Sequence, residues 1–225
     1  MMMMTNKWYI IFFTLIIPLT AFSQKKDFRI WYDISAEHKL IHKLEMNLSA
    51  DVRTYETASK IQEAFLEGGL SYNFNKYLSA AGSYRLLKHI ENDNSYYFRH
   101  KFFADFKGTL PVGEFNFSCR LRFQARTKTY IADDNDDDTN YTGRIKLKSV
   151  YKTPEFPIDP YVYYESFCPM FVDKSRTIGK SRYAAGAEVK ITRHHSADIE
   201  YIFQRDYLPH LSDMNIISIS YNLKF

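Results

Sequence analysis

Hydrophobic and polar residues alternate one by one over most of the chain after residue 27. The segment 115–128, FNFSCRLRFQARTK, places Phe117 and Phe123 on one side and Arg120 and Arg122 on the other. Successive side chains of a β-strand point to opposite faces, so a period of two is typical of strands. The pattern therefore predicts an all-β protein.

The alternation recurs along the chain and predicts a strand in each of eleven segments. These segments are residues 28–37, 44–54, 64–74, 77–88, 97–108, 115–128, 143–151, 159–170, 182–191, 197–207 and 213–225. Short polar connectors alternate with longer, more charged ones, which is typical of an up-and-down meander. A meander leaves two unpaired edges unless it closes, so we expect an antiparallel barrel of 10–12 strands. Bacterial barrels normally have an even number of strands, so we expect either one further strand or that one segment, 28–37, lies outside the wall.

Two kinds of closed barrel fit this pattern. A soluble barrel keeps its apolar face inside, whereas a transmembrane barrel turns that face to lipid and has a polar lumen. Two neighbouring segments carry six basic residues on their polar face, which on a soluble protein would be a solvated surface. An export signal, an aromatic-rich apolar face, two kinds of connector and a terminal aromatic residue favour a transmembrane β-barrel with a polar lumen.

The N-terminal region has the pattern of a signal peptide. Lys7 precedes an apolar run from Trp8 to Leu19, and Ala21 and Ser23 occupy the −3 and −1 positions of a cleavage site before Gln24. The run is shorter than the ~20 residues that a membrane-spanning helix needs, although an uncleaved anchor is the alternative. We expect residues 1–23 to be removed and residues 24–225 to form a barrel in the outer membrane of a Gram-negative bacterium.

The last strand, SISYNLKF, ends the chain on an aromatic residue with no tail to cover it. It looks like the C-terminal strand by which outer-membrane barrels are recognised and inserted. Tyr221, Leu223 and Phe225 would form the insertion signal, with Phe225 facing lipid at the interface. The expected partners are outer-membrane lipid and the barrel-assembly machinery, while the oligomeric state stays open.

Composition narrows the picture a little. Aromatic residues make up 17% of the chain, and Tyr and Phe favour half-buried pleated surfaces. The net charge of +4 is too small to indicate nucleic-acid binding. The two cysteines, Cys119 and Cys168, fall toward opposite ends of their strands, too far apart for a disulfide.

The charges on the polar face are unevenly distributed along the chain. The expected basic wall of the lumen contains Arg99, Lys101, Arg120, Arg122, Arg126, Arg144, Lys146 and Lys148. The expected acidic wall contains Asp33, Glu45, Asp51, Glu188, Asp198 and Glu200. Facing walls would create a transverse field that orients small charged solutes in a narrow, porin-like channel. The alternative is a closed, salt-bridge-filled barrel with a structural or surface-interaction role.

Catalysis is a remote alternative. An outer-membrane hydrolase could hold its histidine on the lipid-facing wall, where His100 lies, but the expected register puts Ala125 opposite His100 and no Ser or Thr beside it. His194 and His195 occupy a turn without a third metal ligand, and the acidic run 133–138 lacks the Gly and Glu of a calcium loop. We expect no catalytic residues, no cofactor and no metal site.

The turns also predict the strand register. Pairing Leu110 with Phe115 sets Asp105 opposite Arg120, and pairing Phe74 with Leu78 sets Glu67 opposite Arg85. The same reasoning at two other turns sets Arg29 opposite Asp51, Lys190 opposite Asp198 and Arg182 opposite Asp206. A one-residue slip would turn every one of these charges toward lipid.

Several stretches resemble a family of small outer-membrane barrels from Bacteroidota that is classified only as a domain of unknown function. The resemblance rests on ISAEHKLIHKLEMNLSADVR, LSYNFNKYLSAAGSYR, YYFRHKFFADF, RLRFQ, RIKLK, DPYVYYE, RYAAGAEVKITRHHSADIEY and the closing strand. It implies the location and the fold of the chain. It implies no activity and supplies no catalytic residues.

Overall fold

The computed structural model describes residues 27–90, 95–128, 139–171 and 178–225. They form eleven strands: β1 (Asp27–Ile41), β2 (Leu44–Tyr55), β3 (Lys60–Asn73), β4 (Leu78–Ile90), β5 (Tyr96–Val112), β6 (Phe115–Lys128), β7 (Asn140–Tyr151), β8 (Ile158–Met170), β9 (Lys180–Lys190), β10 (His195–Asp206) and β11 (Ser212–Lys224). Within these ranges, no helix is long and apolar enough to cross a membrane. The expected signal peptide, residues 1–23, and the acidic run 133–138 lie outside the described residues.

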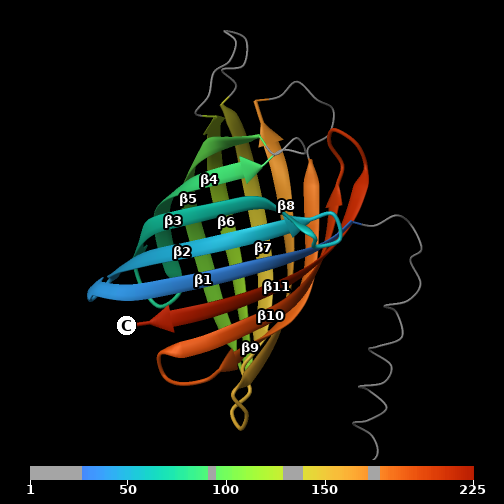
Figure 1. Ribbon diagram of the computed structural model, residues 1–225. Helices are drawn as coiled ribbons and strands as arrows, with labels where there is room; N and C mark the ends of the chain where they lie inside the picture. Colours follow the sequence, from blue (N-terminus) through green and yellow to red (C-terminus); the bar gives the residue numbers. More distant parts are fainter. Residues whose placement is uncertain (1–26, 91–94, 129–138, 172–177) are drawn as a thin grey trace, which may run out of the picture.

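Each strand pairs antiparallel with its neighbour in the chain, and β1 closes the barrel by pairing with β11 in parallel (Figure 1). The parallel direction follows from the odd number, because the first and last strands of an odd antiparallel series run the same way. The expectation that the segment 28–37 fits the wall poorly was wrong: it is part of β1, and its backbone pairs with β2 on one side and β11 on the other.

The apolar face of the wall points outward. Phe117, Phe123, Ile145 and Ile219 are between 41% and 45% exposed, and Tyr201 lies on the same face of its strand. Inward-facing polar residues are covered instead; Asp159 is fully buried and Glu165 is 2% exposed. This arrangement is the inverse of a soluble barrel and agrees with the expected transmembrane type.

The shortest connector changes the predicted register of β5 and β6. Pro111 and Val112 belong to β5, and Val112 pairs with Phe115 across a two-residue turn of Gly113 and Glu114. Gly113 has φ +57°, as the first residue of a tight hairpin turn requires. The predicted pairing of Leu110 with Phe115 was therefore wrong by two residues.

Asp105 consequently faces Arg122, not Arg120. Two further hairpins differ from prediction because their strands continue through residues that we assigned to turns. β1 runs on to Ile41, so Asp33 rather than Arg29 faces Asp51, and Trp31 faces Arg53. Each of these observed registers differs from the predicted one by an even number of residues, so the inward-facing and outward-facing side chains stay as predicted.

At the β9–β10 hairpin, Ile191 bonds to His195, and Lys190 pairs with Ser196 instead of Asp198. The pairing of Arg182 with Asp206 was wrong as well, since Gln204 faces Arg182. The predicted register of β3 and β4 is confirmed.

The C-terminus lies beside the β1–β2 turn (Figure 1). The backbone of Phe225 bonds to Glu37 and Lys39 of β1, and its side chain is 64% exposed on the outer wall. Tyr221 and Leu223 share that outer face. These final residues are thus held in the wall by backbone hydrogen bonds.

Part of the barrel interior is filled by an apolar cluster. It lies along β8 to β11 and β1 and contains Trp31, Tyr161, Tyr163, Ala184, Ile202, Met214 and Ile216. The rest of the inner wall, from β2 to β7, carries most of the basic residues. The interior therefore combines an apolar cluster on one side with a predominantly basic wall on the other.

Candidate functional site

The eight residues of the expected basic wall lie on the inner faces of three adjacent strands, β5, β6 and β7. The register sets like charges opposite one another: Lys101 faces Arg126, and Arg120 faces Lys146. Directly opposed like charges are destabilising unless something compensates them. The inner wall therefore depends on partners from other strands.

The expected acidic residues lie farther round the barrel, on β1, β2, β9 and β10. Here too the ladder opposes like charges, because Asp33 faces Asp51 and Glu188 faces Asp198. Asp51 is bound by Arg53 at 3.1 Å, and Asp198 accepts a hydrogen bond from Asn222 at 2.7 Å.

The other two acidic residues are less engaged with bases. Glu200 accepts hydrogen bonds from the hydroxyls of Tyr161 and Tyr163, at 3.0 and 3.4 Å. Glu45 lies opposite Ser71 on the inner face of β2. That the two walls act together on a solute stays a prediction.

Glu165 of β8 is the main acidic partner of the basic wall, and the sequence analysis did not single it out. Its Oε1 accepts hydrogen bonds from Arg120 Nη2 and Arg144 Nη2, both at 2.8 Å. Arg182 Nη1 lies 3.9 Å from Oε2. The sequence offered one indication: Glu165 stands two residues after Tyr163 and therefore shares its inward face. Both belong to the segment that follows the most basic one.

Aromatic rings hold many of the remaining cations. The Lys146 ammonium lies 3.5 Å from the ring centre of Tyr163, and the guanidiniums of Arg53 and Arg182 lie 4.0 and 4.8 Å from the Trp31 ring centre. Such contacts contribute about 0.5–2 kcal/mol each. They stabilise a cation without neutralising it, so the inner wall keeps a net positive charge.

The main luminal cavity has a volume of about 480 Å³. Ten Lys and Arg residues line it against five Asp and Glu residues, and its aromatic lining is Trp31, Tyr163 and Phe167. A second, polar cavity of about 260 Å³ lies toward the short turns, and Asp33 and Arg122 line both.

Ion pairs mark the junction between these two cavities. Arg122 Nε binds Asp105 at 2.6 Å, and Arg85 Nε binds Glu67 at 2.6 Å, as predicted for the second pair. Both pairs are formed by side chains. The width of the junction between the two cavities therefore depends on the rotamers and charges of these four residues.

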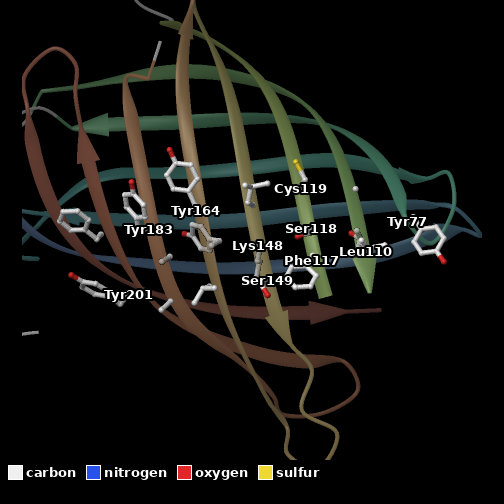
Figure 2. A pocket seen from close by; sticks show the side chains of 18 of the residues that line it. Tyr77, Leu110, Phe117, Ser118, Cys119, Lys148, Ser149, Tyr164, Tyr183 and Tyr201 are labelled. Atoms are coloured by element: carbon white, nitrogen blue, oxygen red, sulfur yellow. The ribbon is translucent and has the colours of Figure 1, made fainter. Parts of the chain in front are cut away.

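A larger hollow, about 1010 Å³, lies on the outer wall instead (Figure 2). Large side chains such as Phe117, Tyr164 and Tyr183 surround small ones such as Ser149 and Ala185, which lowers the surface between them. Its lining is almost entirely apolar and faces away from the charged lumen. We interpret it as a surface for lipid chains.

The histidines have structural partners. His100 Nδ1 lies 2.6 Å from the hydroxyl of Tyr84, and the residue opposite His100 is Thr127, not the expected Ala125. The Thr127 hydroxyl lies 3.2 Å from that of Thr139.

At the short-turn end, His194 Nδ1 lies 2.7 Å from the carbonyl of Lys224, and His195 Nδ1 lies 2.7 Å from the Tyr221 hydroxyl. These contacts tie the β9–β10 hairpin to β11. The described ranges contain no group of three His, Cys, Asp or Glu residues placed to hold a metal ion. Cys119 and Cys168 are both free thiols.

An apolar exterior, a closed meander and a charged interior define a transmembrane-type β-barrel. The chain belongs to the family described as "Protein of unknown function (DUF2490)", whose profile matches residues 28–215. The crystal structure of the β domain of the Bordetella autotransporter Brka has a similar fold, with a TM-score of 0.52 and 9% identity. The similarity covers 79% of this chain and 82% of that one. No curated protein matches the chain in sequence.

Proposed function

We propose that the protein is an outer-membrane barrel of a Gram-negative bacterium of the Bacteroidota branch, and that its lumen passes small charged solutes. The observation that supports a solute path is the charged cavity of about 480 Å³ inside the barrel, which is lined by residues of all eleven strands. An interior needed only for stability would be better filled by apolar side chains, because burying unbalanced charge costs free energy.

The path continues beyond this cavity. The second cavity lies toward the short turns and shares Asp33 and Arg122 with the first. The Asp105–Arg122 ion pair lies where the two spaces meet, because Arg122 lines both and Asp105 lines the second. Rotamer changes are fast compared with solute passage, so such a constriction is compatible with slow, selective conduction.

A closed barrel with a structural or surface-interaction role is the second candidate. Two observations favour it: the apolar cluster that fills one side of the interior, and the ion pairs at the junction of the cavities. Both candidates share the same wall and differ in whether a continuous path exists.

Conductance of the purified barrel in planar bilayers separates the two candidates. A channel gives step-like single-channel events, and the neutral double variant Asp105→Asn/Arg122→Gln gives larger steps because it removes the constricting pair without leaving a lone charge. Silence of both proteins, with folding verified by circular dichroism, rejects the channel and leaves the closed barrel.

Membrane placement has its own test. Leu121 is 50% exposed in the middle of β6, and Gln124 points inward on the same strand. Leu121→Arg should destabilise the barrel folded in lipid vesicles by about 2–4 kcal/mol, measured as a lower free energy of unfolding. This is the cost of a lipid-facing charge near the midplane. Gln124→Arg, which puts the same side chain in the lumen, should cost less. Equal costs would contradict a lipid-facing exterior.

Three further parts of the proposal concern processing, insertion and catalysis. N-terminal sequencing of the exported protein should begin at Gln24.

Removal of Phe225 should slow assembly by the barrel-assembly machinery, measured as the fraction of folded protein in outer membranes. The purified barrel should hydrolyse neither phospholipid nor peptide substrates, since Nδ1 of His100 is engaged by the hydroxyl of Tyr84 at 2.6 Å.

A further inference from the structure

The arrangement around Glu165 leaves the inner wall short of negative charge. One carboxylate serves three guanidiniums, those of Arg120, Arg144 and Arg182, at 2.8, 2.8 and 3.9 Å. Lys146 adds a fourth cation, directly opposite both Arg120 and Glu165 in the ladder. Four positive charges thus lie around one carboxylate at the wall of the main cavity, and Glu200, which also lines it, accepts hydrogen bonds from the hydroxyls of Tyr161 and Tyr163.

The donors of this group are not used up by protein acceptors. Three guanidiniums carry roughly fifteen N–H donors, far more than one carboxylate can accept. The amides of Gln124 and Gln204 take one bond each, from Arg144 and Arg182. Among the described residues, the buried Nε of Arg120 has no hydrogen-bond partner, and no carboxylate lies within ion-pair distance of Lys146.

Aromatic rings hold these cations in place. The guanidiniums of Arg144 and Arg182 stack on the Phe167 ring at 4.4 and 4.8 Å, and Lys146 lies over Tyr163. A guanidinium that stacks by its face keeps its in-plane N–H groups free for an acceptor. The cations are therefore preorganised, and their donors remain available.

From this geometry we infer that the luminal cavity binds a small organic oxyanion, with its phosphate or carboxylate held by Arg120, Arg144, Lys146 and Arg182 beside Glu165. Planar guanidinium forks match the oxygens of such groups in a bidentate manner. The cavity volume of about 480 Å³ lies within the range of small-molecule sites. The inference names the solute class of the proposed channel and rests on that proposal for its role, but binding itself does not require conduction.

Trp31 supplies a direct readout of binding. Trp8 belongs to the segment 1–23, so Trp31 is the sole tryptophan of residues 24–225. Its ring lines the cavity and contacts the guanidinium of Arg182. An anion that draws Arg182 toward itself should change the fluorescence of Trp31.

The experiment titrates the detergent-solubilised barrel with inorganic phosphate, with sodium chloride at equal ionic strength as the reference. Fluorescence and isothermal titration calorimetry are recorded together, because heat is detected even if the tryptophan is silent. We expect saturable binding of phosphate that chloride does not reproduce.

Variants localise the site. Lys146→Gln should weaken phosphate binding roughly tenfold, the loss of one charge-assisted hydrogen bond. Lys88→Gln is the matched control, since Lys88 also lies over a tyrosine ring, at 3.9 Å from Tyr96, but outside the cavity. Glu165→Gln should tighten phosphate binding, because it removes the anion that competes for the same guanidiniums; a residue with only a structural role would not do so.

The outcomes separate this inference from the proposed function. Saturable, Lys146-dependent phosphate binding supports the site, and it does so even if the bilayer experiment shows no conductance. Conductance without phosphate binding leaves the channel standing and overturns the oxyanion site. Equal responses to phosphate and chloride, or equal effects of Lys146→Gln and Lys88→Gln, also overturn it.

Discussion

Replacement of Glu165 by Gln tests how the basic inner wall is held together. The substitution keeps the shape of the side chain and removes its charge. In the wild type this carboxylate, 2% exposed, is bound by Arg120 and Arg144 at 2.8 Å and lies 3.9 Å from Arg182. In the variant three guanidiniums face one another without the anion between them.

The expected cost follows from the distances and the burial. At an effective dielectric constant of about 20, one ion pair at this separation is worth about 6 kcal/mol before desolvation is counted. Desolvation cancels much of that attraction in the intact pair, but it is not recovered when only one partner is removed. Loss of one member of a buried ion pair typically costs about 3–5 kcal/mol, and we expect Glu165→Gln to fall in this range.

Urea unfolding of the barrel in lipid vesicles, followed by Trp31 fluorescence, measures the change. Glu37→Gln is the control: Glu37 binds Lys224 at 3.1 Å, with side chains 33% and 64% exposed, so its loss should cost less than about 1 kcal/mol. Phosphate in the buffer should restore part of the stability lost in Glu165→Gln, since a ligand that binds the folded state stabilises it. A Glu165→Gln variant as stable as Glu37→Gln would refute the reasoning.

Two other predictions test the backbone geometry. A Cβ added to Gly186 would lie 2.6 Å from the Cβ of Glu200, whereas at Gly82 the nearest contact is 4.0 Å away. We therefore expect Gly186→Ala to destabilise the barrel by about 1–3 kcal/mol and Gly82→Ala to leave its stability nearly unchanged. Thermal unfolding measures both. The parallel seam pairs Ser35 with Asn222, whose side chains hydrogen-bond at 2.6 Å; the double cysteine variant at these positions should form a disulfide on oxidation, seen as a mobility shift under non-reducing conditions. A barrel closed with another partner for β1 would leave that pair reduced.

Much of the architecture is encoded locally. Alternation with a period of two assigns each residue a face, and it needs only neighbours in the chain to be recognised. On that basis the sequence located all eleven strands and placed Phe123 outward and Arg122 inward. A lumen richer in bases on β5, β6 and β7 follows from the same pattern.

Register could not be predicted with the same success. A shift of two residues leaves every side chain on its face, so hydrophobicity does not distinguish the pairing of Asp105 with Arg120 from that with Arg122. The difference depends on where the hairpin turns: the sequence pattern predicts Pro111 and Val112 in the turn, whereas both continue β5. At the β3–β4 hairpin the turn was assigned correctly, and Glu67 does face Arg85.

Long-range closure decided the rest. No local pattern shows that the first strand pairs in parallel with the last, because those residues lie at opposite ends of the chain. The same holds for Glu165: its side chain was known only to point inward, and the barrel curvature brings it against Arg120, two strands away. The sequence determined which side chains face the lumen, and the tertiary structure determined which of them meet, because facing depends on adjacent residues and meeting depends on register and closure.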